Sequence, residues 1–145
     1  MKCRNSPSSI EPLEPRIAPA SCAVVDLGEI NGTNGFRTIS GQGAPQGWVV
    51  VSEAGDVNGD GLGDILLGHV DNHRYSGTSG QAYVLFGRAE GFGATVDLNK
   101  LDGTNGFRFY TSLSGPGGRN LTGASLNSAG DINGDGFDDV IIASS

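Results

Sequence analysis

Short apolar runs alternate along the chain with connecting segments rich in Gly, Asn, Ser and Thr. Runs of this length, bounded by turn residues, are typical of β-strands. No segment keeps a 3.6-residue hydrophobic period, so little helix is expected. The 25 glycines fit a fold with many tight turns, and the pattern predicts an all-β protein. The predicted strands span residues 24–27, 37–40, 48–52, 64–68, 81–86, 94–98, 108–112, 124–127 and 139–143.

The chain contains an internal repeat. The hexapeptide Gly-Thr-Asn-Gly-Phe-Arg at 32–37 recurs at 103–108, an offset of 103 − 32 = 71. A nonapeptide rich in Asp, Asn and Gly at 56–64 recurs at 131–139, an offset of 131 − 56 = 75, which predicts a four-residue insertion within 114–122. Self-similarity at this period indicates a repeat architecture. We therefore expect one repeat at 23–93 and a second, truncated repeat at 94–145.

The two nonapeptides carry candidate metal ligands. Side chains with oxygen atoms stand at positions 1, 3, 5 and 9 of each, and Ca²⁺ takes about six to eight oxygen ligands. Glycines at positions 4 and 6 permit the positive φ angles that a tight curl needs. Position 7 has no side-chain oxygen, so its main-chain carbonyl is the expected ligand. The predicted calcium ligands are Asp56, Asn58, Asp60, Leu62 and Asp64 in the first copy, and Asp131, Asn133, Asp135, Phe137 and Asp139 in the second.

Two alternatives compete with this interpretation. An EF-hand begins with similar spacing, but it closes with Glu at position 12 and lies between two helices. Position 12 is Leu67 in the first copy and Ile142 in the second, each within an apolar strand-like run, so the loops are predicted to join strand to strand. The other alternative is an Asx-rich turn without metal. It would leave three carboxylates and an amide crowded together, which costs free energy.

These motifs together resemble FG-GAP repeats, which form the propellers of integrin α-chains and occur in many bacterial surface proteins. The resemblance rests on Ala-Gly before the first nonapeptide, on Tyr-Val-Leu-Phe-Gly at 83–87, and on Ser-Ala-Gly before the second nonapeptide. It implies about two four-stranded antiparallel blades of an incomplete β-propeller, with Ca²⁺ held in the loop between adjacent strands by the same side chains. The chain departs from the family pattern at 68–70, where Gly-His-Val replaces Gly-Ala-Pro, and the second repeat stops at Ser145 before its own Phe-Gly strand.

Two blades alone would not close a ring. Propellers have about four to eight blades, and two blades leave sheet edges and apolar faces that invite pairing with another chain. Three explanations stay open: missing blades from a longer chain, self-association of several chains, or a small open sheet.

Residues 1–22 differ from the rest, since they hold four of the six prolines and no alternating apolar pattern. We expect a disordered N-terminal leader or export segment there. Residues 13–20 partly resemble the LEPR-type N-terminal motif of large exported bacterial surface proteins. Both cysteines, Cys3 and Cys22, belong to this segment.

Charge and composition argue against several classes of function. The net charge of −7 argues against nucleic acid as a partner. No apolar run approaches the roughly 20 residues of a membrane span. The histidines, His69 and His73, have no nucleophile motif beside them, so a catalytic role is not expected, and Trp48 and the Gly-Phe pairs are predicted to pack in the core.

The sequence thus predicts a non-enzymatic, calcium-binding module of an extracellular or cell-surface protein. Its expected role is adhesion or protein–protein interaction, with a protein or glycan ligand. Two other roles stay open. The module could be an accessory propeller region of a larger extracellular enzyme of the phospholipase or polysaccharide lyase type, or it could be a structural spacer.

Overall fold

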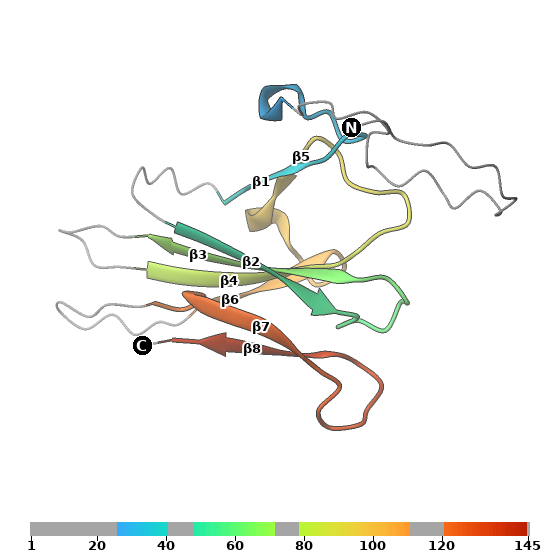
Figure 1. Ribbon diagram of the computed structural model, residues 1–145, viewed down its shortest axis with the longest axis vertical. Coiled ribbons are helices and arrows are strands. Elements are labelled where there is room, and N and C mark those ends of the chain that lie inside the picture. The colour runs from blue at the N-terminus through green and yellow to red at the C-terminus, as the bar shows by residue number, and fades with distance from the viewer. Residues whose placement is uncertain (1–25, 41–47, 72–78, 111–120, 145) are drawn as a thin grey trace, which may run out of the picture.

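A computed structural model describes residues 26–40, 48–71, 79–110 and 121–144. This part of the chain is built of strands and two single-turn 3-10 helices, so the predicted all-β class is confirmed (Figure 1). The helices are η1 (Leu27–Glu29) and η2 (Leu98–Lys100). The strands are β1 (Arg37–Ile39), β2 (Trp48–Gly55), β3 (Asp64–Asp71), β4 (Ser79–Leu85), β5 (Thr95–Asp97), β6 (Gly106–Tyr110), β7 (Ser125–Gly130) and β8 (Asp139–Ala143).

A four-stranded antiparallel sheet in the order β2-β3-β4-β6 forms the centre of the molecule. Strand β6 comes from the second predicted repeat, so the sheet crosses the boundary between residues 93 and 94. The other strands form an antiparallel pair, β7-β8, and a parallel pair, β1-β5. The described strands therefore divide into one complete four-stranded blade and two strand pairs on either side of it (Figure 1).

Each face of the central sheet has its own hydrophobic cluster. Leu66 and Val84 point to the face covered by β7-β8, where Leu126 packs against them. On the opposite face, Tyr83 and Leu85 pack with Leu98 of η2. Burying one such side chain stabilises the fold by about 1.5–3 kcal/mol. Alternation along β3 and β4 thus supplies both clusters, because successive strand residues point to opposite faces.

Two glycines let the chain pass close to the central sheet. Gly68 in β3 lies against the backbone of Gly123, and Gly80 in β4 lies against the backbone of Thr122. A Cβ at either glycine would collide with those main-chain atoms, so only glycine allows the turn before β7 to pack on the sheet.

Aspartates at two equivalent positions, Asp26 and Asp97, are each followed by a 3-10 turn where the sequence predicted a strand. Asp26 accepts a hydrogen bond from the Gly28 N–H at 2.8 Å, and Asp97 accepts one from the Asn99 N–H at 3.0 Å. These local bonds favour a helical turn. The predictions of strand for 24–27 and 94–98 are therefore wrong at Leu27 and Leu98, which begin η1 and η2.

The aromatic residues that were predicted to lie in the core differ in their burial. The rings of the two Gly-Phe pairs, Phe36 and Phe107, pack against the hydrophobic clusters as predicted. The core prediction for Trp48 is wrong, since its side chain is exposed. Trp48 begins the edge strand β2, and an edge position has a neighbouring strand on one side only.

Several predictions fall outside the described residues: the leader at 1–22 with Cys3 and Cys22, the loop with His73, and most of the insertion at 114–122. Within the described residues, no helix is long and apolar enough to cross a membrane.

Candidate metal centre

The two acidic loops connect strands, as the sequence predicted. Residues 56–63 join β2 to β3, and residues 131–138 join β7 to β8. The glycines at positions 4 and 6 have positive φ, at 74° and 84° for Gly59 and Gly61, and at 76° and 93° for Gly134 and Gly136. Because L-residues rarely adopt these angles, glycine is what allows each loop to curl.

Asp56 is the centre of the first loop's hydrogen bonding. Its Oδ1 accepts from the N–H groups of Gly59 at 2.8 Å and Asp60 at 3.1 Å. Its Oδ2 accepts from the Gly61 N–H at 2.8 Å. The glycine angles turn these N–H groups inward, so one carboxylate accepts three of the loop's N–H groups.

Asn58 and Asp60 complete the curl. Asn58 accepts the Asp60 N–H through Oδ1 at 3.0 Å and donates through Nδ2 to Asp60 Oδ2 at 2.9 Å. Asp60 Oδ1 accepts from the Leu62 N–H at 2.8 Å. The structure therefore brings Asp56, Asn58 and Asp60 together, and Leu62 contributes its N–H to them.

Asp64 fixes the loop to the sheet. It is 3% exposed and accepts from the N–H groups of Val57 and Gly87, both at 2.8 Å. Gly87 ends the Phe-Gly segment after β4, so Asp64 connects the loop to the far end of that strand. Burial raises the pKa of the Asp64 carboxyl, and the negative charges of Asp60 and Asp56 add to that rise, although the two backbone hydrogen bonds oppose it.

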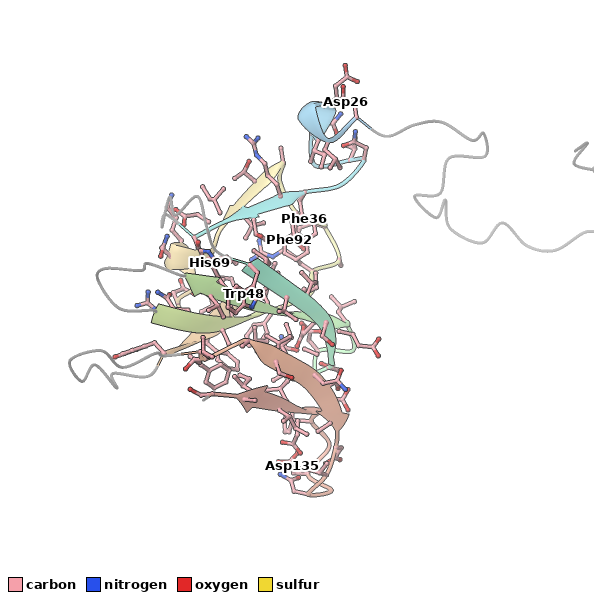
Figure 2. The ribbon with its side chains drawn as sticks, turned by 60° about the vertical axis from the view of Figure 1, so that its left-hand side comes forward. Asp26, Phe36, Trp48, His69, Phe92 and Asp135 are labelled. Atoms are coloured by element: carbon pink, nitrogen blue, oxygen red, sulfur yellow. The ribbon has the colours of Figure 1, made fainter. Side chains whose placement is uncertain are left out.

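The second loop repeats this network. Asp131 accepts from the N–H groups of Gly134 at 2.7 Å and Asp135 at 3.1 Å through Oδ1, and from Gly136 at 2.9 Å through Oδ2. These donors lower the pKa of the Asp131 carboxyl, with the Gly136 N–H the largest cause. Figure 2 shows Asp135 at the tip of this loop.

The remaining ligand candidates of the second loop also match the first. Asn133 accepts from the Asp135 N–H at 2.9 Å and donates to Asp135 Oδ2 at 3.0 Å. Asp135 Oδ1 accepts from the Phe137 N–H at 3.0 Å, and Asp139 accepts from the Ile132 N–H at 3.0 Å. Two loops separated by 75 residues thus have the same internal bonding.

The loops' acids accept hydrogen bonds mainly from backbone N–H groups, as in the Asx-turn alternative. Over the described ranges, no group of three or more His, Cys, Asp or Glu side chains is arranged to hold a metal ion. The donor set nevertheless fits a hard cation in kind, because carboxylate and amide oxygens are its preferred ligands. A carboxylate has about four lone-pair sites, so Asp56, which accepts three hydrogen bonds, keeps acceptor capacity.

Sequence reasoning missed one residue that joins the two loops. Asp138, at position 8 of the second loop, accepts from the Asp56 N–H at 2.7 Å through Oδ2. Its own N–H donates to the Asp56 carbonyl at 3.0 Å. The first loop has Gly63 at that position. An aspartate at position 8 in only one of the two copies is the sequence feature that could have pointed to this contact.

His69 of β3 contacts a serine that follows β1. Its Nδ1 lies 3.0 Å from Ser40 Oγ, and the pair is half-buried beside β3. Figure 2 shows His69 near the end of β3, away from the loop that carries Asp135. A surface or packing role suits this position.

Comparison with known proteins gave one match. Residues 122–145 match the family model described as FG-GAP repeat. Searches of curated proteins and of solved structures found no match. FG-GAP repeats typically occur in extracellular proteins and suggest a propeller-type module for protein–protein interaction. The matched segment contains β7, β8 and the loop between them, and this part of the chain therefore carries the signature of an FG-GAP repeat.

Proposed function

We propose that the chain is a calcium-binding FG-GAP repeat module of an exported or cell-surface protein, with a role in adhesion or protein–protein interaction and without catalytic activity. One Ca²⁺ would bind in each acidic loop. The observation that carries this proposal is the repeated network: Asp56 and Asp131 accept the same three N–H groups of their own loops.

Electrostatics supports a cation in these loops. The stretches 56–64 and 131–139 hold seven of the chain's sixteen acidic residues. In the first loop, burial is the main cause of the raised pKa of Asp64, and the negative charges of Asp60 and Asp56 add to that rise, as expected of like charges that repel. A divalent cation would offset that repulsion.

Each loop would supply four side-chain ligands and one main-chain ligand to its ion. Asp56, Asn58, Asp60 and Asp64 would supply side-chain oxygens, and the Leu62 carbonyl would supply a main-chain oxygen. Their equivalents, Asp131, Asn133, Asp135, Asp139 and the Phe137 carbonyl, would hold the second ion. The bound ion supplies positive charge, and the chain's own residues hold the loop in the curl that presents its outer surface to a partner.

Binding of this kind stabilises the fold by thermodynamic linkage. A ligand that binds only the folded state adds about 2.7 kcal/mol at a hundredfold excess over Kd. Extracellular calcium modules often bind with Kd of about 10⁻⁴–10⁻³ M. Millimolar calcium outside the cell would therefore keep both loops closed.

The test is a comparison of thermal unfolding in about 2 mM Ca²⁺, the extracellular range, and in chelator. The wild-type chain is expected to melt higher with calcium, and Asp60→Ala combined with Asp135→Ala is expected to remove the difference. Asp102→Ala is a matched control, because the Asp102 carboxylate also caps a turn, where it accepts from the N–H and the hydroxyl of Thr104, but lies outside both loops. An unchanged wild-type melting midpoint would reject the calcium proposal.

A further inference from the structure

Two apolar surfaces of the described chain are uncovered, one on the central sheet and one on the β7-β8 pair. The first, here called the β2 face, consists of Val49, Val51 and Glu53 on one side of β2, and all three residues are exposed. The second, the β8 face, is centred on Ile141 of β8, which is also exposed. The two faces are related by the repeat.

The chain already contains one sheet-on-sheet contact between successive repeats. Strands β7 and β8 pack on the central sheet through Leu126, Val140 and Ile142. Beside them, the Ser128 hydroxyl donates to the Ala54 carbonyl at 3.1 Å. Figure 1 shows β7-β8 stacked below the four-stranded sheet.

The 75-residue offset places the β2 face in that contact. Val51 is the equivalent of Leu126, which packs on the preceding sheet and is only 8% exposed, whereas Val51 is 62% exposed. The side of β2 that would pack on a preceding sheet is therefore open. The β1-β5 and η2 layer covers Leu67 and Tyr83 farther along this face, but it leaves the β2 part uncovered.

The β8 face is the other half of the same contact. Ile141 is the equivalent of Leu66, which lies under β7-β8 and is 0% exposed, whereas Ile141 is 59% exposed. Each molecule thus carries both halves of one interface, one on the central sheet and one on the β7-β8 pair.

We propose that a second copy of this chain docks head to tail, with its β2 face on the β8 face of the first. This contact would continue the stack that β7-β8 already forms on the central sheet. It is heterologous, since two different surfaces meet, so it can extend beyond a dimer into a ring or an open chain. The proposal does not depend on calcium binding.

One residue of the β2 face weakens the fit. Glu53 stands where the equivalent contact has Ser128, whose hydroxyl bonds a main-chain carbonyl. A carboxylate there cannot donate to the equivalent carbonyl of Ala129. The association is therefore expected to be weak, and Glu53→Ser is expected to strengthen it about fivefold through one added hydrogen bond.

The experiment is analytical ultracentrifugation of the full chain from about 10 µM to about 1 mM, because small interfaces give weak complexes. The wild-type mass is expected to rise with concentration. Val51→Asp and Ile141→Asp are each expected to stay monomeric. Mixed together, they are expected to form one-to-one dimers and nothing larger, because each variant keeps one intact face. Both positions are exposed, and unchanged melting temperatures would show that the variants fold.

Three outcomes would overturn the proposal. If the wild-type chain stays monomeric at every concentration, the two faces serve a different partner and not a second copy. Ile141→Asp that still dimerises while Val51→Asp does not would indicate a symmetric pairing of β2 faces. A mixture of the two variants that stays monomeric would exclude head-to-tail docking. This experiment measures mass, whereas the calcium proposal is tested by a shift in melting temperature, so the two proposals can fail independently.

Discussion

The contact between the two loops offers a direct test of how the repeats are joined. Asp138 accepts the Asp56 N–H at 2.7 Å, across 82 positions of sequence. Asp138→Ala removes this acceptor and leaves a half-buried N–H without that bond. The reciprocal bond from the Asp138 N–H to the Asp56 carbonyl, at 3.0 Å, uses only main-chain atoms and is kept.

The magnitude follows from the type of bond lost. A hydrogen bond to a charged group contributes about 1.5–3 kcal/mol. Both partners are only half-buried, and water can replace part of the interaction, so we expect a loss of about 1–2 kcal/mol in the free energy of unfolding. For a chain of this size, that loss corresponds to a fall of about 3–8 °C in Tm.

The assay is urea unfolding at equilibrium, followed by circular dichroism in chelator so that metal binding does not contribute. Asp138→Asn is the matched control, because its side-chain carbonyl can still accept the Asp56 N–H, and it is expected to recover most of the loss. The conclusion that this carboxylate joins the loops would be refuted if Asp138→Ala were as stable as the wild type. It would also be refuted if both variants lost the same free energy of unfolding.

Two further pairs of substitutions test the loop anchors, and all four variants are measured by thermal unfolding in chelator. Gly55→Ala and Gly130→Ala place a Cβ at equivalent positions with φ of 79° and 66°, but only at Gly55 does the Cβ meet the Asp138 carboxylate. We expect Gly55→Ala to cost clearly more than the roughly 1 kcal/mol of its partner, and equal losses would contradict the loop contact. Asp64→Asn puts an amide N–H against one of two backbone donors, so a loss of about 1–3 kcal/mol is expected. Asp139→Asn keeps an oxygen for its single donor and should cost less; the reverse order would contradict the anchoring role of Asp64.

Much of the candidate site could be predicted from sequence, because its geometry is local. Glycine at positions 4 and 6 sets the curl, and the Asp at position 1 accepts N–H groups three to five residues later. These bonds form within one loop, so spacing alone encodes them. Its contact with the neighbouring loop through Asp138 could not be predicted in this way, since that contact depends on how two repeats stack.

By itself, the sequence determined the strand-rich fold, the repeat and the two acidic curls, since periodicity and turn chemistry act over a few residues. The tertiary structure alone decided that β6 completes the sheet of the first repeat, and that Leu126 is buried while its equivalent Val51 is exposed. Equivalent residues carry the same local information but meet different neighbours. Burial is a property of those neighbours, and they are brought together only when distant segments pack.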